Sequence, residues 1–148
     1  MTLAQRHQRL IDDLLIIPDR QERLAVIVDQ ARRLQPFSTV ERIDGHRVTG
    51  CQSAVWLIGE LQADGTLALR VDADSPLVKG LVHLLCAAYS GATPAEIAAT
   101  EPTFLDELGL LRDLSPTRRN GLTAVRNRIR EIARTITVSS SPASPSPT

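Results

Sequence analysis

The chain has 148 residues, a length that fits one domain with a core large enough to need no disulfide or metal. Its 17 lysines and arginines equal its 17 aspartates and glutamates, so the net charge provides no strong field for binding nucleic acid or a membrane. We expect no signal peptide, because positions 5 to 9 are polar, and no apolar run is long enough to cross a bilayer. These features predict a soluble cytoplasmic protein with free thiols.

Two helices are predicted at the start of the chain. The first covers Leu3 to Ile17, where leucine and isoleucine recur at helical spacing, and it ends at Pro18. The second begins after Asp19, a good N-cap, and runs to about Leu34.

Three antiparallel strands are predicted next. We expect them at Thr39–Ile43, Ser53–Leu61 and Thr66–Asp72. The dipeptide Asp44-Gly45 indicates a tight turn, because both residue types tolerate positive φ, and Asp64-Gly65 is a strong hairpin signal. Alternating apolar positions in the third strand imply one face on the core and one nearer water.

The rest of the chain is predicted to be helical up to a disordered tail. The helices are expected from Pro76 to a break at Ser90-Gly91, from Pro94 to about Thr100, from Pro102 to Leu108 and from Pro116 to Ile136. Residues 137–148 are rich in serine and proline and cannot offset their ordering entropy by burial. The expected fold is therefore α+β, a three-stranded antiparallel sheet packed against helices in a domain of residues 1–136, with a disordered tail at 137–148.

Cys51 is the main candidate for a functional residue. It follows Gly50 at the end of a short polar loop, and glycine lets the backbone bend sharply or approach a partner closely. A thiol can be presented at such a loop tip, although the residues alone leave open that Cys51 is simply a small buried side chain. Cys86 lies in the apolar stripe of its helix, so we expect it to be buried and unreactive.

Several sequence blocks form a recognisable set. The main ones are Val48–Trp56, Asp74–Leu81 and Leu114–Leu122, joined by Tyr89–Ile97 and Leu108–Leu110. In this order and spacing the blocks resemble the SufE family of sulfur-acceptor proteins. The resemblance covers roughly residues 10 to 133. It implies a small antiparallel sheet packed against helices, a fold shared with the IscU-type iron–sulfur scaffolds.

The resemblance also implies an activity for Cys51. A pyridoxal-phosphate cysteine desulfurase, of the SufS or CsdA kind, would hold sulfur as a persulfide and transfer it to this cysteine. The sulfur would then go to an iron–sulfur scaffold complex of the SufBCD kind or to another acceptor, and its removal would speed the desulfurase. The chain would be a carrier and activator and not an enzyme, with no cofactor of its own. Neither nucleic acid nor membrane is expected as a partner, and both monomer and homodimer stay open.

Arg118 and Arg47 are candidates for supporting the thiol. Transfer between thiols requires a thiolate, which nearby cations stabilise. Arg118 matches the Ser-Pro-x-Arg pattern of the family and could approach the loop from the last helix, or it could anchor the loop through carboxylates. Arg47 and His46 lie close to Cys51 in the sequence, although a histidine at a turn is often simply solvated.

The remaining candidates are weaker. Gln52 and Ser53 could donate hydrogen bonds to a sulfur anion or merely hold the turn, and Trp56 is expected to pack in the core. His7 and His83 lie apart from any cysteine or carboxylate cluster, so no metal site is predicted.

Two other functions stay open at this point. An iron–sulfur scaffold of the IscU kind would need several thiolate, imidazole or carboxylate ligands around the cluster. A stand-alone thiol transferase or hydrolase would need a histidine and an orienting acid around the cysteine, and the nearby candidates are His46 and Asp44.

Overall fold

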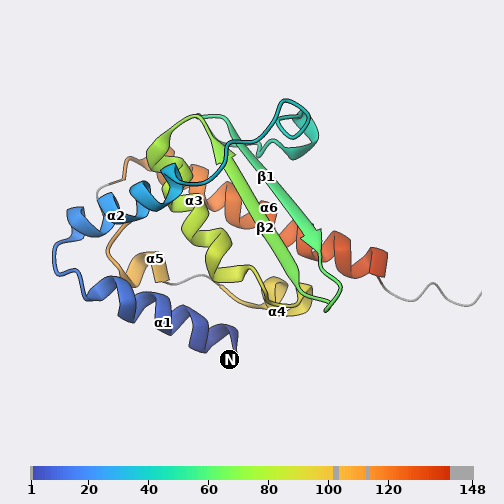
Figure 1. The fold of residues 1–148 in the computed structure, drawn as a ribbon, viewed down its shortest axis with the longest axis horizontal. Helices are drawn as coiled ribbons and strands as arrows, with labels where there is room; N and C mark the ends of the chain where they lie inside the picture. Colours follow the sequence, from blue (N-terminus) through green and yellow to red (C-terminus); the bar gives the residue numbers. More distant parts are fainter. Residues whose placement is uncertain (1, 102–103, 113, 141–148) are drawn as a thin grey trace, which may run out of the picture.

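A two-stranded antiparallel sheet, β1 (Val55–Leu61) and β2 (Leu67–Ala73), lies among the helices of an α+β fold (Figure 1). The structure is a computed structural model and describes residues 2–101, 104–112 and 114–140. The two strands pair along their whole length and are joined by a tight turn. Gly65 in that turn has a φ of 83°, a left-handed conformation that favours glycine, so the hairpin predicted at Asp64-Gly65 is confirmed.

The third strand predicted at Thr39–Ile43 is wrong, because this segment forms turns instead. The backbone N–H groups of Glu41 and Arg42 both donate to the carbonyl oxygen of Ser38, each at 3.0 Å, so the backbone is satisfied locally and not in a ladder. Val40 is 78% exposed, which shows that no apolar face drives this segment onto the sheet.

The segment that leads into β1 makes one isolated strand-like pairing and one short turn. Arg47 forms a single antiparallel bridge with Trp56 of β1. The turn predicted at Asp44-Gly45 is present as a short 3-10 helix, Asp44–His46, but neither Asp44 nor Gly45 has a positive φ. The reason given for that turn was therefore incorrect, although its position was right.

The N-terminal helices form where they were predicted and end slightly earlier. Helix α1 (Leu3–Leu15) begins with a capping box between Thr2 and Gln5. Helix α2 (Arg20–Arg32) begins at Asp19, whose side chain accepts the N–H of Gln21.

Helix α3 (Pro76–Tyr89) is the central helix of the fold and packs against both β2 and α2. Ser75 caps it, and Pro76 lies in its first turn, where the helix was predicted to begin. A Cβ atom at Gly80 would lie 3.0 Å from the Cα atom of Val28, so a glycine is needed for α2 and α3 to approach this closely.

The C-terminal part of the chain supplies α4 (Pro94–Ala99), α5 (Phe104–Glu107) and α6 (Pro116–Ser140). The predicted start of α5 at Pro102 lies outside the described residues. Helix α6 extends past the predicted boundary at Ile136, because lengthening an existing helix needs no new nucleation. The remainder of the predicted tail, residues 141–148, lies outside the described part of the chain.

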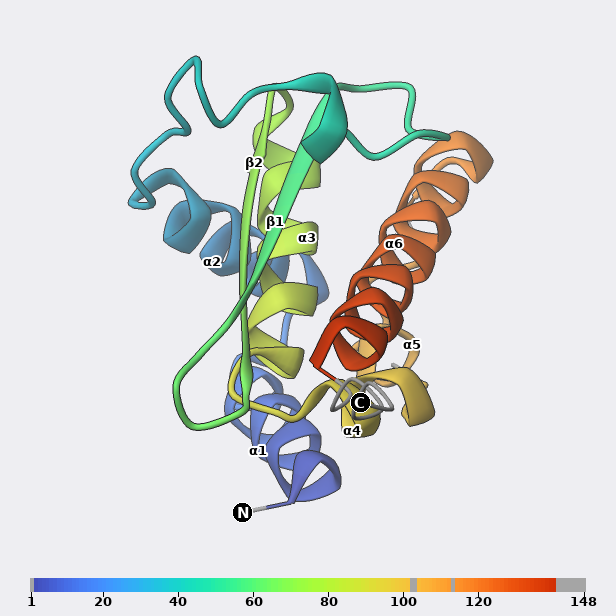
Figure 2. The same ribbon diagram turned by 90° about the vertical axis from the view of Figure 1, so that its right-hand side faces the viewer.

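Figure 2 shows how this arrangement places the loop before β1. Helix α3 lies between α2 on one side and α6 on the other, and the loop reaches across from β1 to the N-terminal part of α6. None of the helices in the described ranges is both long and apolar enough to span a membrane.

Candidate functional site

The loop Thr49–Ala54 is the tip of a short hairpin that lies on α6. Its base is fixed because the N–H of buried Val48 donates to the carbonyl oxygen of Val55 at 2.9 Å. At the tip, Gly50 has a φ of 91°, which strains any residue with a side chain. A Cβ atom at Gly50 would lie 3.2 Å from the Cβ atom of Ala124, so the tip and the helix are already in close contact.

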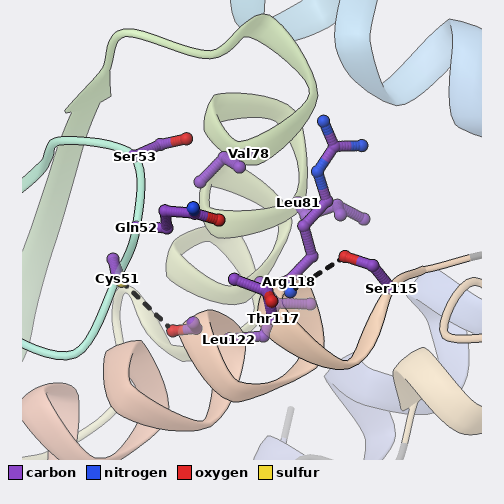
Figure 3. Close-up of a pocket in the computed structure, with 10 residues that line it drawn as sticks. Cys51, Gln52, Ser53, Val78, Leu81, Ser115, Thr117, Arg118 and Leu122 are labelled. Atoms are coloured by element: carbon purple, nitrogen blue, oxygen red, sulfur yellow. Dashed lines mark hydrogen bonds between the residues drawn. The ribbon is translucent and has the colours of Figure 1, made fainter.

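The thiol of Cys51 is half-buried against α6. Its Sγ atom donates to the carbonyl oxygen of Gly121 at 3.4 Å, as Figure 3 shows. A Cβ atom at Gly121 would lie 3.6 Å from Sγ, so the thiol packs where a larger helix side chain would extend. Burial raises the pKa of the Cys51 thiol, and deprotonation would also remove the donated hydrogen bond. The resting thiol is therefore protonated at neutral pH.

A cavity of about 490 Å³ opens beside the thiol. It combines polar groups from the loop and from the start of α6 with apolar side chains from α3. Among the residues that line it with Cys51 are Gln52, Ser53, Val78, Leu81, Thr117 and Arg118 (Figure 3). The volume lies within the range of small-molecule sites and far exceeds the roughly 30 Å³ that one water molecule occupies. There is therefore room for an additional sulfur atom on Cys51.

Arg118 lines the same cavity as Cys51. Its backbone N–H donates to Oγ of Ser115 at 3.3 Å, which fixes the first turn of α6. In Figure 3 its guanidinium extends away from Cys51, so it does not contact the thiol in this conformation. No carboxylate among the described residues forms an ion pair with Arg118, so carboxylate anchoring of the loop is not supported.

Arg47 and His46 are placed differently. Arg47 lines a second cavity of about 500 Å³, on the side of the loop that does not contain the thiol, so the structure brings Arg118 but not Arg47 into the cavity of Cys51. The Nδ1 atom of His46 lies 2.8 Å from the carbonyl oxygen of Glu41, which holds the ring in its own turn. Sequence proximity to Cys51 therefore did not predict which charged side chain shares its cavity.

Trp56 and Cys86 lie outside the cavity. Trp56 is half-buried and not in the core as expected, with the guanidinium carbon of Arg42 4.6 Å from its ring centroid. Cys86 is 2% exposed, and burial raises its pKa to about 12, so its predicted burial is confirmed. Within the described residues, no group of three or more histidines, cysteines, aspartates and glutamates could hold a metal ion.

Asp72 anchors the segment that leads into the loop. Its buried carboxylate accepts the N–H of Phe37 at 2.9 Å and forms ion pairs with Arg42 at 2.7 Å and Lys79 at 3.2 Å. Desolvation alone would raise the pKa of Asp72, but these hydrogen bonds outweigh it and hold the pKa below its ordinary value. The cluster ties the segment before the loop to both β2 and α3.

Gly121 and Ala124 are site residues that the sequence did not single out. Both contact the loop tip from α6. The available signal was a glycine inside an otherwise regular helix, which costs about 1 kcal/mol relative to alanine and so calls for a packing reason. Ala124 gave no signal, because alanine is ordinary in a helix.

Comparisons with known proteins identify the family of the chain. The chain matches the family model "SufE: Fe-S metabolism associated domain" over residues 8–133. It is 32% identical over 130 residues to an uncharacterised SufE-like protein of Rhizobium etli, a match that covers 85% of this chain and 88% of the relative. It is also 32% identical over 120 residues to an uncharacterised SufE-like protein of Synechocystis, covering 81% of this chain and 75% of that relative. The chain therefore belongs to the SufE family, whose domain is associated with iron–sulfur metabolism.

Proposed function

We propose that this protein accepts sulfur on Cys51 from the persulfide of a pyridoxal-phosphate cysteine desulfurase, stimulates that enzyme and delivers the sulfur for iron–sulfur cluster assembly. The observation that carries the proposal is a thiol at a loop tip beside a cavity with room for one more sulfur atom. Membership of the SufE family supports a cysteine desulfurase as the donor.

The proposed transfer is an exchange of one sulfur–sulfur bond for another. The Cys51 thiolate attacks the terminal sulfur of the donor persulfide and forms a new bond between that sulfur and Sγ. The original sulfur–sulfur bond breaks, and the donor cysteine leaves as a thiolate. Cys51 then carries the terminal sulfur as a persulfide, and no oxidant or reductant is consumed.

The resting geometry indicates that the loop tip must move before this exchange. Cys51 is protonated and hydrogen-bonded to the carbonyl oxygen of Gly121, so it is not yet a nucleophile. Arg118 is the cation in the same cavity, and we assign it the role of supporting the sulfur anion once its side chain turns inward. Arg47 faces the other side of the tip, and we assign it to contact with the donor protein.

No observation favours the two alternative functions. A cluster scaffold would need several ligands together, and the described residues contain no group of three or more suitable side chains. A stand-alone transferase would need a base beside the cysteine, whereas His46 is bound to the Glu41 carbonyl and does not line the cavity of Cys51.

The proposal is tested by mixing the protein with purified desulfurase and cysteine and measuring added sulfur by mass spectrometry. Cys51→Ser should abolish both sulfur loading and stimulation of the desulfurase, while the fold stays intact. Cys86→Ala is the matched control and should keep both, at a cost of about 1 kcal/mol for a small core truncation. Loading that survives in Cys51→Ser would refute the proposal.

A further inference from the structure

The loop tip rests on α6 at two neighbouring points. Gly50 lies over Ala124, and Cys51 lies over Gly121. Gly121 and Ala124 are three residues apart in the helix, so they belong to one face. The position of the thiol therefore depends on two small residues that hold the tip close to the helix backbone.

The contact between Gly50 and Ala124 leaves no spare space. A Cβ atom at Gly50 would lie 3.2 Å from the Cβ atom of Ala124, which is closer than ordinary van der Waals contact between carbons. A Cβ atom at Gly50 would therefore press against Ala124, and we expect a larger side chain at position 124 to press against Gly50 in the same way. The contact between Cys51 and Gly121 is looser, because a Cβ atom at Gly121 would lie 3.6 Å from Sγ.

We propose that Ala124 is a positioning residue for Cys51, because a side chain no larger than its methyl group lets Gly50 come close enough to α6 for the thiol to reach the carbonyl oxygen of Gly121. When the tip is seated, Cys51 is shielded and hydrogen-bonded. When the tip is lifted, the thiol loses its acceptor and meets water. Exposure and deprotonation of the thiol are therefore coupled in one movement, whose use in sulfur acceptance rests on the proposed function.

The charged groups around the tip favour deprotonation once the thiol is lifted. Arg118 is the charged side chain that lines the cavity of Cys51. The cavity on the other side is lined by the charged residues Asp44, Arg47, Arg128 and Glu131. Arg128 and Glu131 form an ion pair at 3.1 Å, so their charges largely cancel. The remaining charges near the tip are the positive ones of Arg47 and Arg118 and the negative one of Asp44.

The test is the rate at which iodoacetamide alkylates Cys51 between about pH 6 and 10, followed by mass spectrometry that separates Cys51 from Cys86. Ala124→Val adds carbon under Gly50 and should raise the rate at neutral pH at least about fivefold, with an apparent pKa below that of the wild type. Ala124→Gly removes the methyl and should leave the rate and the pH profile close to wild type.

This pair of variants separates positioning from stability. Both substitutions lower helix propensity, and glycine lowers it more than valine. If position 124 mattered only for the fold, the alkylation rate would follow the loss of melting temperature and would be highest in Ala124→Gly. A wild-type rate in a folded Ala124→Val protein, or an equal increase in both variants, would overturn the proposal.

Gly50→Ala provides an independent arm if Ala124→Val does not fold. It places the extra carbon on the loop side and should also raise the alkylation rate of Cys51. Adding Ala124→Gly to Gly50→Ala removes the opposing methyl and should bring the rate part of the way back. No recovery in the double variant would also overturn the proposal. The assay uses no desulfurase, so its failure is distinct from a failure of the proposed function.

Discussion

Cys51 and Cys86 are the same residue type in two differently packed regions. Cys86 lies inside α3 and belongs to the buried hydrophobic core. Cys51 lies at a loop tip on α6, with a cavity of about 490 Å³ beside it. Burial raises the pKa of both thiols, so both are protonated at neutral pH.

The comparison shows that the cysteine proposed to accept sulfur and the cysteine buried in α3 are both protonated at rest. The two cysteines differ in how much of the structure must move before the thiol is exposed. Exposing Cys86 requires α3 to leave the core, whereas exposing Cys51 requires the loop tip to leave α6, with the loss of the hydrogen bond to Gly121 and of the half-burial of the thiol. Local opening of this kind takes far less free energy than global unfolding.

The largest difference in stability between the two regions should appear when each cysteine is replaced with aspartate. Cys86→Asp buries an unpaired charge and should cost about 3–5 kcal/mol, most of the stability of a marginal domain. Cys51→Asp can turn its carboxylate into the cavity and should cost less than about 1 kcal/mol. Urea unfolding of both variants measures the difference, and similar losses would mean that the loop tip is as firmly packed as α3.

A smaller loss of stability should result from lowering the pH, through a histidine that packs against α3. His7 of α1 is 8% exposed and packs edge-on against the ring of Tyr89 in α3, with centroids 5.4 Å apart. Burial lowers the pKa of His7 below 6.5, a backbone hydrogen bond with Ala88 offsets this only in part, and Arg6 lowers it further.

Because the native state binds this proton less readily than the unfolded chain, stability should fall as the pH drops below about 6.5. Thermal melts at successive pH values measure this loss, and His7→Phe should reduce it while keeping a ring against Tyr89. Some loss should persist, because burial and Lys79 also lower the pKa of His83. An unchanged pH dependence in His7→Phe would show that His7 does not contribute.

The smallest predicted difference between the two regions concerns local dynamics, which hydrogen exchange measures. In the free protein we expect fast exchange at Thr49–Gln52 and slow exchange in β1. Val48 should also exchange slowly, because its N–H donates to Val55. Binding of the desulfurase should change exchange at the tip only. Strong protection of the tip in the free protein, unchanged on binding, would place the required movement in the desulfurase instead.

Elements with local signals could be predicted from the sequence. Helix α2 begins after the expected cap Asp19, helices α3 and α4 begin at the expected prolines Pro76 and Pro94, and the hairpin turns at Asp64-Gly65. The third strand was wrong because the fate of residues 39–43 depends on a distant partner. The preceding Phe37 is held by Asp72 of β2, and no local pattern near Phe37 encodes that contact.

The candidate site also has features that the sequence predicted and features that it did not. The loop position of Cys51 and the matching block around Arg118 were visible in the sequence, and the structure places both residues at one cavity. The contacts that hold the loop tip on α6 could not be predicted, because the positions of Gly121 and Ala124 relative to the tip depend on how α6 crosses the loop. Arg47 was a candidate because it lies close to Cys51 in the sequence, but it lines a different cavity from the one that Cys51 lines.

The order of the chain has a consequence for the newly made protein. Cys51 lies in the first half of the sequence, whereas the carbonyl oxygen of Gly121 and the methyl group of Ala124 belong to the last helix. Synthesis proceeds from the N-terminus, so the thiol leaves the ribosome long before the surface that covers it exists. Until α6 docks, Cys51 has neither acceptor nor shield. Completion of the polypeptide is thus the step that half-buries the thiol and reduces its exposure to cellular oxidants.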